Sequence, residues 1–368
     1  MDRFGCPGNM REEGFSSSHD HIPWHGFCQM KILFWGTPDY AVPTLEALIE
    51  SGHTIVGVVT QPDRRRGRGK QLIPSPVKAR ALDLGCPVFT PERIRKDIEV
   101  QQTLKQLNAD VSVVVAFGQI LPKSVLQQPP LGCWNGHGSL LPRWRGAGPI
   151  QWSLLEGDSE TGVGIMAMEE GLDTGPVLIE QPLAIGLSDN AEQLSQKLSQ
   201  LTGELMVKAM GRIAAVGPGP ESDRLSRLGV TKQDEKSGTA SYARMLKKED
   251  FLVDWKRSAL DLHRQVMALY PNTYTHWQGK RLKLRNTEPL IHRLRDQLST
   301  EAQALIGRWP TAGHPAGTVL SCEQNIGLVV STTGCPLLIR SAQLEGKGTS
   351  EGSTMLQQLQ ASDGMTLG

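Results

Sequence analysis

Three polar side chains stand at alternate positions in the stretch CWNGHGSLLPRWRGAGPI, residues 133–150. They are Asn135, His137 and Ser139, and on an extended chain they point to one face. An amide is a fixed hydrogen-bond donor, and an imidazole titrates near neutral pH. Together they suit acyl transfer, in which N–H donors stabilise a tetrahedral oxyanion while a base takes the proton of an attacking amine. The other interpretation is a strand end whose polar side chains are simply hydrated.

Asp173 is the carboxylate that could complete such a site. It stands 36 residues after His137, in the glycine-flanked segment EEGLDTGP between two expected strands. An Asp in a loop of this kind is more often a turn former than a catalyst. If the loop folds beside His137, however, the carboxylate would orient the imidazole and stabilise its charge.

The elements that must position these side chains alternate between strands and helices. We expect strands at 31–35, 54–61, 110–118, 131–138, 162–169 and 176–185, and helices at 40–52, 75–85, 148–157 and 190–213. Nearly continuous apolar strands separated by helices are typical of a mostly parallel sheet covered on both faces. The predicted fold is therefore α/β, with a Rossmann-like sheet whose ligands bind beyond the carboxyl ends of the strands.

The pattern changes after this α/β region, so we expect a second domain. Residues 30–214 form the predicted catalytic domain, and the Gly- and Pro-rich residues 215–238 are expected to be a linker. Beyond them, one helix at 259–270 is followed by short strands with glycine turns, which favours a small C-terminal β-barrel of the oligonucleotide-binding (OB) type at 239–368. Residues 1–29 lack the apolar stretch of a signal peptide and are too acidic for a transit peptide, and we expect this extension to be dispensable.

Bulk composition excludes several classes of protein. The 368 residues carry a net charge of +1, with 39% hydrophobic and 21% charged residues, as in ordinary globular proteins. No apolar run approaches the ~20 residues of a membrane span. The six cysteines form no C-x-x-C pair, which disfavours a disulfide scaffold or zinc ribbon and favours a reducing compartment. We expect no metal, since no ligands stand at a recognised spacing.

Two common catalytic motifs are also missing. The turn after the first expected strand, GTPDYA, has one glycine where the dinucleotide-binding fingerprint has three. The chain contains no G-x-S-x-G elbow, which disfavours a serine hydrolase of that kind.

Charge is distributed unevenly along this nearly neutral chain. Residues 156–192 hold nine acidic residues and no Lys or Arg, whereas residues 60–80 hold seven basic residues against Asp63 alone. Residues 241–296 hold twelve basic residues against six acidic ones. A charge run is usually just a solvated face. Two separate basic segments nevertheless favour a polyanionic partner that is held at particular places.

The motifs taken together identify a family. GHGSLLPRWRGAGPI, with Asn135 before it and GLDTG after it, resembles the folate-dependent formyltransferases. The segments GTPDYAVPTLEAL, VVTQPDRRRGRGK, PSPVK and VVVAFGQILP resemble the members that act on methionyl-tRNA, and SYARMLKKEDFLVDW does so more weakly. Two features depart from the usual pattern: Gly136 replaces a commoner apolar residue between Asn and His, and three arginines stand at 64–66.

This resemblance implies a reaction, its substrates and its site residues. Asn135, His137 and Asp173 match the family's catalytic residues, and the formyl group would pass from 10-formyltetrahydrofolate to the α-amino group of initiator methionyl-tRNA. The residues that would line the folate site are Ser139, Leu140, Leu141, Pro142, Phe117, Gly118, Gln119 and Ile120. The residues that would contact tRNA are Arg64, Arg65, Arg66, Arg68 and Lys70. The basic C-terminal domain would bind the body of the tRNA.

Two other functions stay open on the sequence alone. One is a formyltransferase that also uses 10-formyltetrahydrofolate but acts on a small amine, and the other is a non-catalytic RNA-binding protein. A formyltransferase for a small amine would not explain the two basic segments. An RNA-binding protein without catalysis would not explain why Asn135, His137 and Asp173 match the catalytic pattern. We further expect a monomer without membrane association, located in a bacterial-type cytoplasm or in an organelle.

Overall fold

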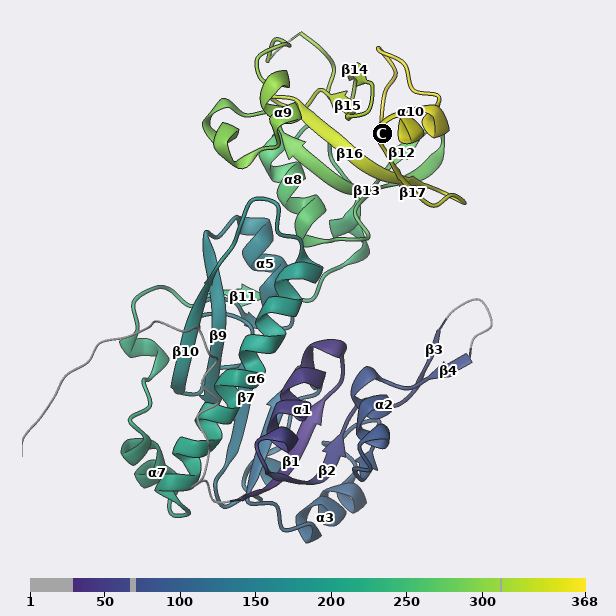
Figure 1. Cartoon of the computed structure of the whole chain (residues 1–368). Helices are drawn as coiled ribbons and strands as arrows, with labels where there is room; N and C mark the ends of the chain where they lie inside the picture. The colour runs from purple at the N-terminus through teal and green to yellow at the C-terminus, as the bar shows by residue number, and fades with distance from the viewer. Residues whose placement is uncertain (1–28, 67–70, 312) are drawn as a thin grey trace, which may run out of the picture.

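The computed structural model describes residues 29–66, 71–311 and 313–368. The N-terminal extension up to residue 28, and Arg68 and Lys70, lie outside the described residues. Figure 1 shows two domains, one around a large sheet and one around a smaller sheet near the C-terminus. None of the helices in the described part of the chain is both long and apolar enough to cross a membrane.

The first domain is built on a seven-stranded sheet with the order β10-β9-β7-β6-β1-β2-β5. Five neighbouring strands are parallel, while β9 and β10 are antiparallel at one edge. The mostly parallel α/β sheet predicted from the sequence is therefore confirmed. Its strands are β1 (Lys31–Gly36), β2 (Thr54–Val59), β5 (Val88–Phe89), β6 (Val111–Val115), β7 (Cys133–His137), β9 (Glu160–Ala167) and β10 (Val177–Ala184).

Helices cover both faces of this sheet because its central strands are apolar on both sides. On β1, Ile32 and Phe34 face one core, whereas Leu33 and Trp35 face the other. The first face carries α1 (Val42–Glu50), α2 (Pro76–Asp83), α5 (Pro149–Glu156) and α6 (Ala191–Val216); the second carries α3 (Ile98–Gln106) and α4 (Lys123–Leu126). Helix α6 begins at a capping box in which Asn190 and Gln193 bond each other's backbone.

The stretch that the sequence analysis assigned to a linker, 215–238, is packed against the first domain. It contains α7 (Glu221–Leu228), whose Leu225 and Leu228 join the larger core. Buried Arg224 donates to the carbonyl of Leu131 at 2.7 Å. The Gly and Pro residues before α7 break the helical pattern but leave a short amphipathic helix that buries its apolar side. The predicted boundaries at 214 and 239 stay a prediction.

The C-terminal domain is sheet-rich and antiparallel, as expected. Its strands follow the order β12-β13-β16-β15-β14, with β17 beside β16. Hydrogen bonds of residues 365–368 reach both β14 and the carbonyl of His276 on β12, so the chain end joins the two edge strands. The strands are β12 (Tyr274–Trp277), β13 (Lys280–Pro289), β14 (Val319–Glu323), β15 (Gly327–Val330), β16 (Leu337–Leu344) and β17 (Thr349–Glu351).

Helices pack on both sides of this second sheet. Helices α8 (Ala259–Ala268) and α10 (Gly352–Leu359) contribute to its interior core, and α9 (Thr300–Leu305) packs on the opposite side of β15 and β16. Helix α8 also packs against α5 of the first domain. At this junction the ring of His263 lies 2.8 Å from the carbonyl of Leu187 and 3.0 Å from the hydroxyl of Thr287, and burial lowers its pKa.

Candidate active site

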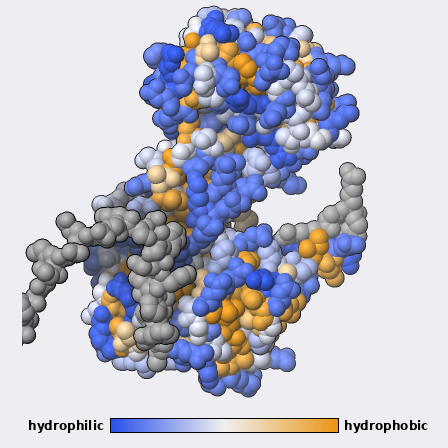
Figure 2. Space-filling model, viewed as in Figure 1, coloured by the Kyte–Doolittle hydropathy of each residue, from blue (hydrophilic) through white to orange (hydrophobic). Residues whose placement is uncertain are grey.

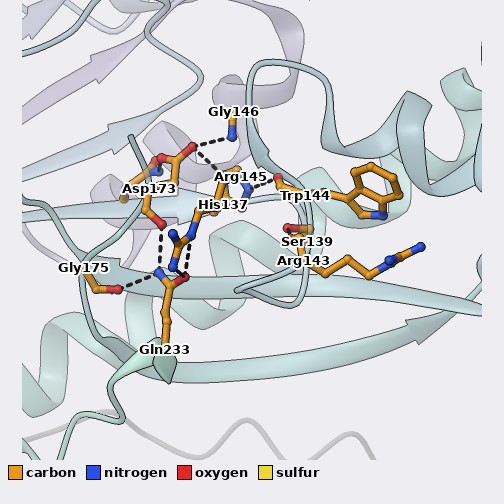
Figure 3. Close-up of polar contacts among 10 residues, drawn as sticks. His137, Ser139, Arg143, Trp144, Arg145, Gly146, Asp173, Gly175 and Gln233 are labelled. Carbon is orange, nitrogen blue, oxygen red and sulfur yellow. Dashed lines mark hydrogen bonds and ion pairs between the residues drawn. The ribbon is translucent and has the colours of Figure 1, made fainter. Parts of the chain in front are cut away.

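Strand β7 places the first two predicted catalytic side chains at the carboxyl end of the sheet. Asn135 and His137 are only 9% and 5% exposed, so they are not hydrated strand-end residues. The strand lies between parallel β6 and antiparallel β9, which fixes its backbone on both sides. Figure 3 shows His137 pointing toward the loop that carries Asp173.

Gly136, the departure from the family pattern, is explained by what packs behind β7. A Cβ atom at this position would come within 2.5 Å of the Thr202 methyl on α6. Thr202 is held by hydrogen bonds to Leu198 and to the hydroxyl of Tyr40. A close helix therefore takes the space that an apolar side chain would need. Burial raises the pKa of Tyr40 to about 12, so its phenol stays protonated and is not a base.

Asp173 lies in the loop between β9 and β10, and the structure brings it beside His137. Its carboxylate accepts from the Gly146 N–H at 2.8 Å and from the Asn135 amide at 3.4 Å. The same carboxylate lies 3.7 Å from Nδ1 of His137. Asp173 has a φ of +52°, a backbone conformation that Asp adopts more readily than most residues. The three predicted residues thus meet in one place, while their catalytic roles stay a prediction.

The hydrogen bonding of His137 assigns its ring nitrogens. Nε2 lies 2.9 Å from the carbonyl oxygen of Trp144. A carbonyl only accepts, so Nε2 carries the proton in the neutral ring and the lone pair is on Nδ1. Nδ1 is therefore the ring nitrogen that faces Asp173 and can take part in proton transfer.

Residues that the sequence analysis did not single out complete the site. The amide of buried Gln233 donates to the carbonyls of Asp173 and Gly175, each at 2.8 Å, and its oxygen accepts from Arg145 (Figure 3). Ser241 accepts from the backbone N–H of Trp144 at 2.9 Å. Gln233 begins a short 3-10 helix (Gln233–Glu235) and Ser241 opens the weakly matching segment SYARMLKKEDFLVDW, but neither pattern indicated a role at this site.

The predicted folate-contacting residues fall into three places. Phe117 and Gly118 line a cavity of about 240 Å³ at the carboxyl ends of β1, β2 and β6, together with Arg64. Gln119 and Ile120 border a second cavity of about 400 Å³, and the Gln119 side chain bonds the backbone of residues 91–94. Three more residues follow β7 and line a third cavity of about 440 Å³; these are Leu140, Leu141 and Pro142.

Two of these folate candidates have side chains engaged within the protein. Ser139 is 1% exposed and donates to the carbonyl of Arg143 at 2.6 Å. Leu141 is equally buried and packs with Met166 and Val177. In this structure they shape the loop that follows β7. Their contact with folate stays a prediction.

Three of the predicted tRNA-contacting arginines, Arg64, Arg65 and Arg66, lie on a strand of a hairpin that projects from the first domain (Figure 1). It is formed by β3 (Arg64–Arg66) and β4 (Gln71–Ile73), in which Arg65 pairs with Leu72. Leu72 and Ile73 are 63% and 40% exposed, and Figure 2 shows hydrophobic surface on this hairpin. Arg68 and Lys70 lie outside the described residues.

A second basic surface lies on the C-terminal domain. Strand β13 presents Arg281, Lys283 and Arg285 between its buried leucines, and the Arg281 guanidinium lies 4.4 Å from the ring centre of Tyr274. Burial, together with the two neighbouring arginines, lowers the pKa of Lys283. Like charges gathered beside an aromatic ring suit a phosphate backbone and its bases.

No group of three or more His, Cys, Asp or Glu among the described residues is arranged to hold a metal ion. The four described cysteines are free thiols.

Comparison with known proteins places this geometry in a family. Residues 30–210 match the formyl transferase family model and residues 245–360 match the model of the formyl transferase C-terminal domain. The solved structure of HypX from Aquifex aeolicus shares the fold at 15% identity, with a TM-score of 0.57 over 92% of this chain and 49% of that longer chain. An N-formyltransferase from Helicobacter canadensis, in complex with folinic acid and dTDP-3-aminofucose, gives 17% identity and a TM-score of 0.56 over 84% of this chain and 99% of that chain.

Much closer relatives are found among curated sequences. A methionyl-tRNA formyltransferase from Synechococcus sp. (strain CC9311) is 68% identical over 332 residues, which is 90% of this chain and 97% of that protein. One from Prochlorococcus marinus (strain MIT 9313) is 63% identical over 337 residues, 92% of this chain and 98% of that protein. The chain belongs to the methionyl-tRNA formyltransferase family.

Proposed function

We propose that this enzyme transfers the formyl group of 10-formyltetrahydrofolate to the α-amino group of initiator methionyl-tRNA, giving N-formylmethionyl-tRNA. The observation that carries the proposal is the meeting of Asn135, His137 and Asp173 at the carboxyl end of the sheet. Family membership supports both substrates. Tetrahydrofolic acid is bound in one solved HypX structure of the same fold.

The reaction begins when the neutral α-amino group attacks the formyl carbon. An α-amino group titrates near ~8, so a useful share is neutral at cellular pH. A new C–N bond forms and the formyl oxygen becomes an oxyanion. We assign the Asn135 amide and the Nδ1–H of protonated His137 as its donors, because both lie on one strand and Nε2 is engaged by Trp144.

Asp173 serves as the charge partner of His137 and as the acceptor of the amine proton, directly or through water. Its carboxylate is close enough to Nδ1 to stabilise an imidazolium. The Gly146 N–H and the Asn135 amide hold it in place. The intermediate then breaks the bond between the formyl carbon and N10 of folate, and N10 takes up the proton that Asp173 or its water had received from the amine.

The two basic surfaces favour tRNA over a small amine as the acceptor. The β3–β4 hairpin and the β13 face belong to different domains, so they would hold an acceptor larger than either domain's cavity. A single chain supplies the catalytic residues and both surfaces, which supports a monomer as the active form. We place the reaction in the cytoplasm, where initiator tRNA is used.

Formylation of charged initiator tRNA by the purified enzyme, with 10-formyltetrahydrofolate as donor, tests the proposal directly. Aminosugar nucleotides and glycinamide ribonucleotide serve as competing acceptors in parallel reactions. We expect transfer to the tRNA alone. Transfer to a small amine but not to tRNA would favour another formyltransferase, and tRNA binding without transfer would leave only an RNA-binding protein.

A further inference from the structure

The orientation of His137 depends on one backbone carbonyl. That carbonyl belongs to Trp144, which has a φ of +60°. Bulky residues rarely adopt a positive φ, and such a conformation persists only where the surroundings enforce it. The groups that hold Trp144 in this conformation therefore also hold the histidine.

Part of the enforcement comes from a segment far along the chain, β11 (Tyr242–Ala243), which runs parallel to β8 (Arg145–Gly146). The hydroxyl of Ser241 accepts from the Trp144 N–H at 2.9 Å, and its carbonyl accepts from the Arg145 N–H at 2.9 Å. This segment leads into the C-terminal domain, yet it fixes the backbone on both sides of the Trp144 carbonyl.

Side chains add a second restraint, a cation–aromatic stack formed by Arg143, Trp144, Trp152 and Arg244. The Arg143 guanidinium lies 4.5 Å from the Trp144 ring centre, and the two indoles stack at 6.1 Å with an interplanar angle of 27°. The Arg244 guanidinium lies 4.8 Å from the ring centre of Trp152. Each guanidinium is attracted to the electron-rich face of the ring beside it.

Both ends of the cation–aromatic stack are anchored by carboxylates. Asp158 binds Arg143 at 2.9 and 2.5 Å and also accepts from the Trp144 indole at 2.7 Å. Asp250 binds Arg244 at 2.8 and 2.7 Å. The Trp152 indole donates to the Arg244 carbonyl at 2.8 Å, so the Trp152 ring is tied to the same distant segment.

We propose that Ser241 and Arg244 are positioning residues for His137, acting through Trp144. They keep the Trp144 carbonyl on Nε2 and so keep Nδ1 facing Asp173 and the reacting atoms. The inference rests on the proposed function for the role of His137. It adds that the segment leading into the C-terminal domain controls the tautomer and orientation of the histidine.

The test compares Ser241→Ala with Ser241→Thr, which keeps the hydroxyl, and with Ser226→Ala, an exposed serine on α7. Arg244→Ala probes the stack independently. We expect Ser241→Ala to lower kcat by about 10- to 100-fold, the usual result of misplacing a catalytic group by about 1 Å. The KM for tRNA and for folate should stay unchanged, and the pH profile of kcat should change.

The ring-nitrogen NMR signals of ¹⁵N-labelled His137 give a readout that needs no activity. In the unchanged enzyme we expect the neutral ring to carry its proton on Nε2 alone, and Ser241→Ala and Arg244→Ala should mix in the other tautomer. Ser241→Thr should restore both kcat and the single tautomer. A Ser241→Ala enzyme with unchanged kcat and unchanged ring signals would overturn the inference. Absence of formylation in the unchanged enzyme would instead count against the proposed function, because the NMR comparison stands without it.

Discussion

Replacing Asp173 by Asn removes the charge of this side chain in the loop between β9 and β10 while keeping its shape. The Asn oxygen can still accept from the Gly146 N–H, and Asn tolerates the positive φ at this position. The change should therefore leave the fold and the free energy of unfolding nearly unaffected. What is lost is the attraction between the carboxylate and a protonated His137, together with the proposed proton acceptor.

The size of the loss follows from the distance between the two groups. The carboxylate oxygen and Nδ1 of His137 are 3.7 Å apart, and the Asp173 side chain is only 15% exposed. Unit charges about 4 Å apart interact by ~4 kcal/mol at an effective dielectric constant of about 20. Since 1.36 kcal/mol corresponds to tenfold in rate, the upper limit is roughly 10³-fold. We expect kcat to fall by at least ~100-fold, the scale of one lost catalytic group.

Single-turnover formylation with enzyme in excess over charged tRNA measures this step without product release. Glu170→Gln is the matched control, because it removes the same charge from an exposed residue of the same loop. That control should react at the rate of the unchanged enzyme. If Asp173→Asn stayed within about tenfold of that rate, Asp173 would be a loop-forming residue and the assigned proton path would be wrong.

Further predictions follow from other parts of the structure. His137→Ala or Asn135→Ala should each lower kcat at least ~100-fold with little change in thermal stability, measured by single-turnover assay and calorimetry. Arg281→Ala should weaken tRNA binding and lower its log–log salt slope by about 0.7–0.9, whereas folate binding stays constant; filter binding over a salt series decides this. Gly136→Val should destabilise the fold by about 1–3 kcal/mol in urea unfolding, because its side chain meets Thr202. The pKa of His263 is lowered in the folded protein, so the unfolded chain binds a proton at this residue at higher pH. The free energy of unfolding should therefore fall by up to ~1.4 kcal/mol per pH unit as the pH drops below about 6.5. Urea unfolding over a pH series measures this, and His263→Gln should lack this pH-dependent loss of stability.

The sheet could be predicted because its strands carry a strong local signal. Residues 111–115 are buried on both faces, and an apolar run of this length, interrupted only by Ser112, is typical of a central parallel strand. Helix α7 was not predicted, since its eight residues follow a Gly–Pro stretch that indicates a linker. The pairing of β8 with β11 gave no signal at all, because each strand has two residues and the partners stand nearly a hundred positions apart.

The residues of the candidate site also differ in how far the sequence alone could predict them. Asn135 and His137 were predictable because the period of a strand puts alternate residues on one face. Asp173 was predictable only as a conditional partner, since its position depends on how a loop folds over the sheet. Gln233 and Ser241 reach the site through hydrogen bonds to residues far from them in the sequence, which only the folded structure can show.

The hydrogen bonds from Gln233 and Ser241 change how much of the chain should be counted as part of the candidate site. A chain ending near 214 would keep the three candidate catalytic side chains, but it would lose α7, whose Leu228 helps cover the core. It would also lose the Gln233 amide that holds the Asp173 carbonyl and the Ser241 hydroxyl that holds Trp144. Buried carbonyl and N–H groups left without partners cost about 1–3 kcal/mol each, so the site would loosen before the sheet did. The smallest fragment that can keep the geometry of the site therefore extends to about residue 250, beyond the pairing of β11 with β8 and far enough to keep Asp250, which anchors Arg244. The chain between the two domains is, on these contacts, part of the candidate site.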